Sequence, residues 1–152
     1  MSLFTDVRSG RTGAAIQEKI GRKVESVNRQ AVSRGIQAVN ALRNAEMEVL
    51  EGQRSGRVYR KPDSKATYTA SAPGEPPARR TGNLRLHWNG RVIKESISSG
   101  GIVVTAELES QEPYAGILEH GSRRMAPRPF VEKIKEKAMP EIKKIYGKPY
   151  RT

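Results

Sequence analysis

Small and apolar residues recur at every third or fourth position through the first third of the chain. Their spacing averages about 3.7 residues, close to the roughly 3.6 residues per turn of an α-helix. This pattern predicts one long helix over residues 14–51, with Thr12 as its N-cap and Gly52 just beyond its C-terminal end. The stripe consists of Ile16, Ile20, Val24, Val27, Ala31, Gly35, Ala38, Leu42, Ala45 and Val49.

At about 1.5 Å per residue, a helix of this length is longer than a small domain is wide. Two interpretations stay open: the stripe packs on its own domain, or the helix reaches across a subunit boundary. Gly21 and Gly35 each weaken a helix by about 1 kcal/mol relative to alanine. Gly35 is therefore a position at which the helix can break.

Residues 52–80 show no periodicity and are rich in Gly, Ser, Pro, Arg and Lys. They predict a long, flexible basic arm, in which Pro73, Pro76 and Pro77 favour an extended backbone. Loops of this length in compact domains are usually functional or disordered. The arm is either a mobile surface segment or one that orders against a neighbouring subunit or nucleic acid.

Regular patterning returns after Thr81, which can cap a short turn. Residues 91–98 and 102–109 read as two strands, and Ser99-Gly100-Gly101 between them is typical of a hairpin turn. In the second strand one face carries Ile102, Val104, Ala106 and Leu108. Trp88 is expected to anchor this sheet by packing in the core.

A short helical turn from Tyr114 to His120, ended by Gly121, is expected after Pro113. Residues 122–128 follow as an extended basic loop. Pro129 stands where the first residue of the last helix would be, and that helix runs from about 130 to 146. Its apolar positions are Phe130, Ile134, Ala138, Ile142 and Ile145, and Pro140 should kink or split it. Residues 81–146 thus supply the sheet and the C-terminal helix of a single α+β domain.

Composition limits the core and the range of chemistry. Of the 152 residues, 36% are hydrophobic and only 5% aromatic, so a modest core that gains stability from oligomer contacts is expected. The chain has no cysteine, which excludes disulfides and thiolate sites. No apolar run approaches the roughly 20 residues of a membrane-spanning helix, so no membrane partner is expected.

The net charge of +12 favours a nucleic-acid partner or an acidic protein surface. About half of the excess lies in residues 52–85, where eight basic side chains stand against Asp63 and Glu75. The eight are Arg54, Arg57, Arg60, Lys61, Lys65, Arg79, Arg80 and Arg85. No zinc-finger, helix-turn-helix or aromatic RNA-binding pattern accompanies them, so only non-specific phosphate contact remains open.

No catalytic, metal or cofactor site is predicted. His87 and His120 are the two histidines, and Glu119 beside His120 points in a different direction within a helical turn. Arg123, Arg124 and Arg128 form a basic patch between Gly121 and Phe130. This patch is either a solvated loop or an interface that docks acidic groups. Phe130 is expected to be a core anchor.

Two segments of the chain resemble a known family. Residues 72–85 carry a Pro-Gly-x-Pro-Pro…Thr-Gly-x-Leu-Arg pattern on Pro73, Gly74, Pro76, Pro77, Thr81, Gly82, Leu84 and Arg85. Residues 114–130 carry a second pattern on Tyr114, Ala115, Glu119, Gly121, Met125, Pro127, Arg128, Pro129 and Phe130. In this order they resemble the tail-completion or head–tail joining (neck) proteins of tailed phages and prophages.

The resemblance implies a small α+β domain: an antiparallel sheet packed by helices, with a long loop. It implies a structural protein rather than an enzyme, often a hexameric ring at the head–tail junction or the top of the tail tube. Partners would be further copies of the chain, tail-tube and head-connector proteins, and DNA in the channel. Such a protein would act in the host cytoplasm during assembly and then in the virion neck.

The expected interface residues are Arg79, Arg80, Arg85, Arg123, Arg124 and Arg128. The sequence departs from the family at His120-Gly121-Ser122, where an apolar residue, glycine and threonine are usual. The long helix, Pro140 and residues 147–152 are not explained by the resemblance. The alternative function is a basic protein that binds nucleic acid without sequence preference.

Overall fold

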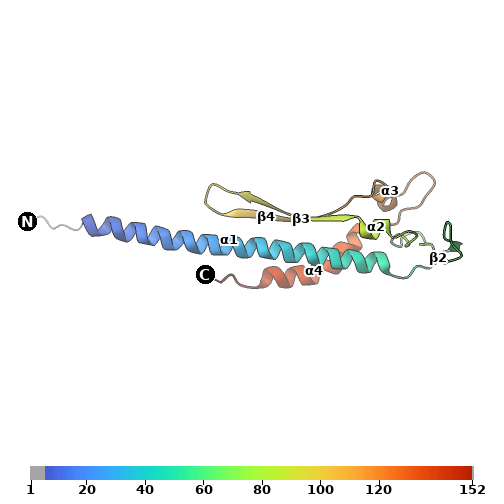
Figure 1. The fold of residues 1–152 in the computed structure, drawn as a ribbon, viewed down its shortest axis with the longest axis horizontal. Helices are drawn as coiled ribbons and strands as arrows, with labels where there is room; N and C mark the ends of the chain where they lie inside the picture. The colour runs from blue at the N-terminus through green and yellow to red at the C-terminus, as the bar shows by residue number, and fades with distance from the viewer. Residues whose placement is uncertain (1–5, 152) are drawn as a thin grey trace, which may run out of the picture.

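The computed structural model describes residues 6–151 and has the α+β architecture expected from the sequence. Helix α1 (Asp6–Glu51) runs along the length of an elongated molecule (Figure 1). The antiparallel hairpin of β3 (Trp88–Ser96) and β4 (Ile102–Ser110) lies along one side of it. Helix α4 (Val131–Gly147) lies along the other side, and the N-terminal part of α1 extends beyond both.

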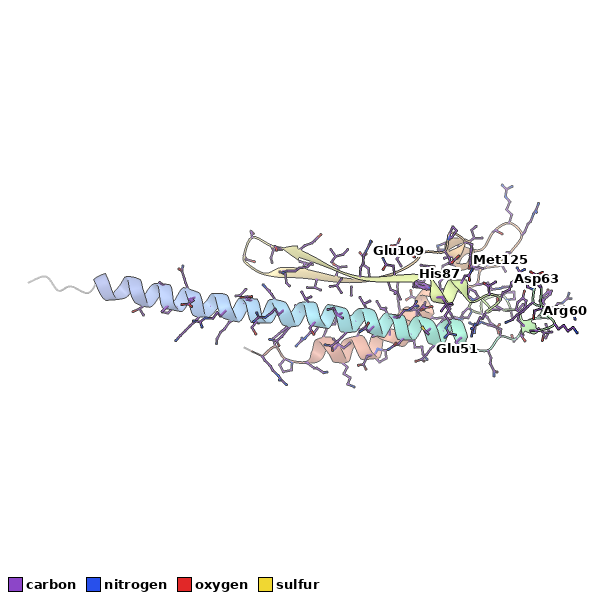
Figure 2. All side chains as sticks on the ribbon, viewed as in Figure 1. Glu51, Arg60, Asp63, His87, Glu109 and Met125 are labelled. Atoms are coloured by element: carbon purple, nitrogen blue, oxygen red, sulfur yellow. The ribbon has the colours of Figure 1, made fainter. Side chains whose placement is uncertain are left out.

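The shorter elements gather at the C-terminal end of α1. They are the hairpin of β1 (Val58–Arg60) and β2 (Thr67–Thr69), α2 (Asn83–Leu86) and α3 (Ala115–His120). Arg60 and Asp63 mark the tip of this end, and Glu51, His87 and Met125 lie nearer the middle of the molecule (Figure 2). None of the described helices is long and apolar enough to cross a membrane.

Helix α1 begins earlier than predicted, and Thr12 is not its N-cap but lies inside it. The C-terminal end at Glu51 agrees with the prediction, and the Gly52 amide donates to the Glu48 carbonyl at 3.2 Å. The helix does not break at Gly35. A Cβ at this residue would lie 2.7 Å from Cγ1 of Val104, so glycine allows the sheet to approach the helix.

The sheet confirms the predicted alternation. Ile102, Val104, Ala106 and Leu108 are partly buried, whereas Val103, Thr105 and Glu109 are exposed; Glu107 is the exception, because it is also partly buried. β3 starts at Trp88 and ends at Ser96, so it begins before and ends short of the predicted strand 91–98. Gly100, with φ of 80°, closes the turn. Gly90 likewise allows the sheet to approach the helix, because a Cβ there would lie 2.5 Å from Cγ1 of Val39.

The core lies where the second half of α1 meets α4, α2 and the start of the sheet. Its buried members are Ala45, Leu50, Leu84, Phe130, Ile134 and Ala138. Phe130 is 1% exposed, and its ring meets that of Trp88 edge-on at 6.1 Å between centroids. The expected core roles of both aromatic residues are therefore confirmed. Pro140 lies inside α4 and does not split it.

The C-terminal tail, unexplained by the sequence, is tied to α1. Arg34 is 7% exposed and donates to the carbonyl oxygens of Tyr146 at 3.4 Å and Pro149 at 3.0 Å. Its guanidinium lies 3.7 Å from the centre of the Tyr150 ring, a cation–π contact. Gln30 exchanges two hydrogen bonds with the backbone of Arg151. The tail thus extends the contact of α4 along the helix.

Glu46 is a fully buried carboxylate beside the core. Its Oε2 accepts from Nη1 of Arg43 at 2.8 Å, while Oε1 has no partner among the described residues. Burial raises the pKa of Glu46 to about 7, against the opposing effect of Arg43 and Arg85. The folded chain therefore holds this proton at pH values where the unfolded chain has released it.

Replacing Glu46→Gln should stabilise the protein increasingly as pH rises. Because the folded pKa is raised, the stabilising contribution of Glu46 is complete below about pH 4.5 and is lost as pH approaches 7. Glutamine mimics the protonated form, so the gain over the parent should grow to about 1–2 kcal/mol at pH 8. Urea unfolding at pH 5 and pH 8 measures it. An equal difference at both pH values would contradict the buried, protonated carboxyl.

Candidate interface cleft

The two motif segments, residues 72–85 and 114–130, meet in space. The Gly74 amide donates to the Pro127 carbonyl at 3.2 Å, and Nζ of Lys133 donates to the Gly74 carbonyl at 2.8 Å. Gly74 has φ of 81°, which favours glycine at this turn. Segments separated by the whole β3–β4 hairpin in the sequence therefore form one continuous structure.

The second segment folds as predicted around Gly121. Helix α3 ends there with φ of 78°, and a Cβ on Gly121 would lie 2.8 Å from the Met125 carbonyl oxygen. The Ser122 amide donates to that carbonyl at 2.8 Å, and the Arg128 amide returns to the Leu118 carbonyl at 2.7 Å. These bonds fix the backbone of the arginine-bearing loop. Its first part, residues 122–125, is not extended as predicted but forms a tight turn closed by the Ser122–Met125 bridge.

Glu119 connects this loop to α4. Its Oε2 accepts from the backbone amides of Phe130 at 2.8 Å and Val131 at 3.1 Å. A carboxylate at this helix start satisfies free amides and interacts favourably with the helix dipole. Phe130 is the N-cap residue, so Pro129 lies outside the helix and not at the predicted first position. The acceptor comes from another helix, which the local sequence could not indicate.

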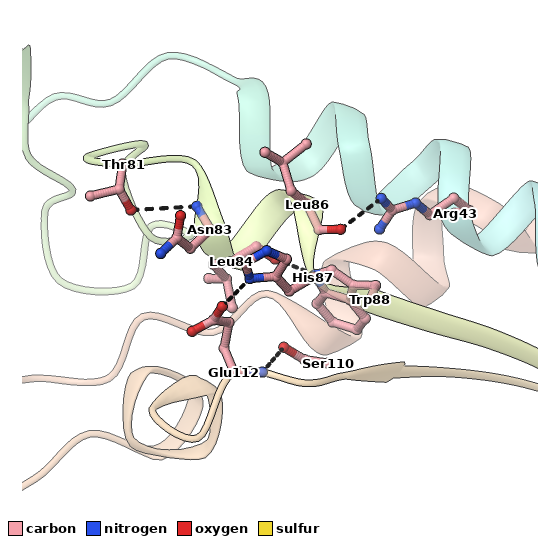
Figure 3. A network of polar contacts seen from close by, with 9 residues as sticks. All are labelled: Arg43, Thr81, Asn83, Leu84, Leu86, His87, Trp88, Ser110 and Glu112. Atoms are coloured by element: carbon pink, nitrogen blue, oxygen red, sulfur yellow. Dashed lines mark hydrogen bonds and ion pairs between the residues drawn. The ribbon is translucent and has the colours of Figure 1, made fainter.

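A polar network holds α2 against its neighbours (Figure 3). Oγ1 of Thr81 accepts from the Asn83 amide at 3.4 Å, and Nε1 of Trp88 donates to the Leu84 carbonyl. Nδ1 of His87 contacts a carboxylate oxygen of Glu112. Nη2 of Arg43 donates to the Leu86 carbonyl at 3.5 Å, which joins α2 to α1.

An open cleft of about 620 Å³ lies where these elements meet. It gathers four of the six predicted interface arginines: Arg79, Arg80, Arg85 and Arg128. Motif residues Pro77, Thr81, Gly82, Leu84, Tyr114 and Met125 also line it. Burial, followed by Glu112, raises the pKa of Tyr114, which keeps its hydroxyl neutral.

The remaining predicted residues lie away from the cleft. Arg123 and Arg124 are exposed at the outer end of the loop and do not line it. The structure therefore divides the predicted Arg123–Arg124–Arg128 patch between a solvent-facing pair and a half-buried cleft residue. Pro73, Gly74, Pro76, Glu119, Gly121, Pro127, Pro129 and Phe130 belong to the surrounding framework.

The structural roles of two side chains in this region were not predicted. Arg54 donates to the carbonyl oxygens of Val49 at 2.7 Å and Gly52 at 2.6 Å, which closes the end of α1, and it also reaches Pro77 at 3.1 Å. Glu75 accepts hydrogen bonds from the Ser55 hydroxyl and from the amides of Ser55 and Ala72. The arm also contains the β1–β2 hairpin, which was not predicted from the sequence.

Replacing Glu75→Ala should loosen the base of the arm. The Ser55 hydroxyl and the two amides hold the pKa of Glu75 near 2, so its contribution is present above about pH 4.5 and is lost as pH falls towards 2. Amide hydrogen exchange at Ser55 and Ala72 should accelerate in the variant. Glu132→Ala removes an exposed carboxylate elsewhere and should leave both amides unchanged; equal effects of the two variants would refute the assignment.

The part of the chain that the structure describes contains no cluster of three or more His, Cys, Asp or Glu side chains suited to a metal ion. His87 and His120 belong to different elements, α2's end and α3. The candidate site is therefore the arginine-lined cleft.

Known proteins give no further assignment. The chain matches no protein-family model, no curated protein and no solved structure.

Proposed function

We propose that the chain is a structural protein of a tailed phage or prophage that joins the tail to the head connector. The resemblance of residues 72–85 and 114–130 to neck and tail-completion proteins motivates this proposal. The observation that carries it is the meeting of these two segments at one arginine-lined cleft. A cleft framed by rigid loops is suited to a protein partner. The protein acts in the host cytoplasm during assembly and in the virion neck afterwards.

The projecting part of α1 supports assembly into a ring. Ile16, Ile20 and Val24 are 52%, 55% and 36% exposed, although they continue the stripe that packs under the sheet. The turn of the β3–β4 hairpin reaches along α1 as far as Asn28, whose Nδ2 donates to the Gly100 carbonyl at 3.3 Å. Nothing in the described chain covers the helix beyond this point, so the stripe is available to a neighbouring copy.

A basic nucleic-acid-binding protein is the second candidate, because the β1–β2 hairpin exposes Arg57, Arg60 and Lys65 beside Tyr59, which is 49% exposed. Non-specific phosphate contacts would give an affinity that falls steeply with salt. In the proposed neck protein such contact would be limited to DNA passing through the ring.

Binding to tails or heads should depend on the arginine loop. With Arg123→Ala, Arg124→Ala and Arg128→Ala combined, cosedimentation with purified tails and with connector-bearing heads of the same phage should weaken by about tenfold or more. The combination Lys143→Ala, Lys144→Ala and Lys148→Ala removes equal charge from the opposite end of α4 and serves as the control. Equal losses in both would indicate general charge attraction and contradict a specific interface at the loop.

A further inference from the structure

The arginines of the cleft carry charge that the chain leaves largely unneutralised. Of the described residues that line the cleft, none is acidic. Arg85 makes one ion pair from the edge, with its Nη1 3.3 Å from Oε1 of Glu51, and it also acts electrostatically on the buried carboxyl of Glu46. Arg79, Arg80 and Arg128 form no ion pair within the described chain. The cleft is therefore strongly cationic and selects an anionic ligand.

Two of these arginines are held in place with donors unused. The side chain of Arg85 is 16% exposed, and Arg128 is half-buried. Nε of Arg85 and Nη1 of Arg128 are buried without a hydrogen-bond acceptor among the described residues. Leaving a buried donor unsatisfied is unfavourable. These two nitrogens have almost no accessible surface, so a carboxylate in the cleft would pair with the other N–H groups of the two planar guanidiniums, which suit two-pronged contact.

Beside the arginines and the polar side chains of Ser71, Thr81 and Asn83, the cleft has a large apolar and aromatic lining. It comprises Leu50, Leu84, Leu118, Met125, Tyr68 and Tyr114. A ligand that fills the cleft must therefore bury apolar groups beside its negative charge. A nucleic-acid duplex presents phosphates at its surface, keeps its bases stacked inside, and is too wide to enter a cleft of about 620 Å³. A short extended peptide has the right dimensions.

We propose that the cleft binds a short acidic segment of a partner protein, with Asp or Glu carboxylates next to Leu, Ile or Phe side chains. The carboxylates contact Arg85 and Arg128 inside the cleft, and Arg79 and Arg80 at its exposed rim. The apolar side chains pack on Leu84 and its neighbours. This binding site goes beyond the joining role and holds whether or not the partner belongs to a phage neck.

The test is selection of random short peptides displayed on the surface of a carrier phage against the full-length chain. Enriched peptides should contain carboxylates adjacent to aliphatic or aromatic residues. Synthetic copies should bind about tenfold or more weakly to the Arg85→Gln/Arg128→Gln variant. Arg79→Gln/Arg80→Gln, which changes only exposed rim residues, should also weaken binding and guards against a folding defect in the first pair.

Lys143→Gln/Lys144→Gln is the matched control, because it removes two positive charges near the C-terminal end of α4, outside the cleft lining. It should retain the parental affinity at physiological salt. The proposal is overturned if no peptide is enriched, or if the control and cleft variants lose affinity equally. It is also overturned if a short oligothymidylate displaces the selected peptide and binds the cleft more tightly, since the ligand would then be single-stranded nucleic acid.

Discussion

Phe130→Ala should cost about 3–5 kcal/mol of unfolding free energy, the largest loss expected from a single truncation in this chain. The side chain is 1% exposed and packs against Trp88, within the cluster that joins α1 to α4. Glu119 holds the backbone at Phe130, which limits how far this segment can move into the space. Urea unfolding followed by circular dichroism measures the loss.

The chain contains one tryptophan, so Trp88 fluorescence reports the same change locally. Its emission should shift to longer wavelength in Phe130→Ala as water reaches the ring. Val131→Ala is the control: the next residue is 37% exposed, and its loss should stay within about 0.5 kcal/mol. A cost below about 1 kcal/mol for Phe130→Ala would show that this contact is not central to the core.

Gly35→Leu should cost about 2–3 kcal/mol and detach the β3–β4 hairpin from α1. The new Cβ would lie 2.7 Å from Cγ1 of Val104 and 3.1 Å from Cγ1 of Val92. Overpacking of this kind outweighs the gain of about 1 kcal/mol in helix propensity. A two-stranded sheet is marginally stable alone, so its amides should exchange faster with solvent once the helix is displaced.

Gly21→Leu provides the matched control on the same helix. A Cβ at Gly21 meets no atom within 4 Å, so helix propensity alone acts there and the variant should be neutral or more stable by up to about 1 kcal/mol. Measured together by thermal unfolding, Gly35→Leu should lower the midpoint temperature, whereas Gly21→Leu should leave it unchanged or raise it. Destabilisation of equal size in both would mean that the sheet does not rest on α1 at Gly35.

The sequence predicted those elements whose signals are local. Periodicity located α1 and α4, alternation assigned the inward face of β4, and Gly121 marked the end of α3. Local signals failed where distant groups decide the structure. Gly35 reads as a helix breaker until Val104 is seen against it, and Pro129 reads as a helix start until Glu119 supplies the cap.

The candidate site was predicted in part. The two motif segments identified all four arginines of the cleft, but the sequence could not separate Arg128, half-buried in the cleft, from the exposed Arg123 and Arg124. That distinction follows from the loop closure between Ser122 and Met125. The β1–β2 hairpin has three-residue strands, too short for alternation to show.

Electron microscopy of mixtures with separated heads and tails tests the proposed joining role most directly. The full-length chain, carrying a visible tag at its exposed N-terminal helix, is added to connector-bearing heads and purified tails of the same phage. If the chain joins tail to head, label should appear at the connector or the upper end of the tail, and joined particles should form only when the chain is present. Label on neither structure, together with tight, salt-sensitive binding to DNA alone, would contradict this role.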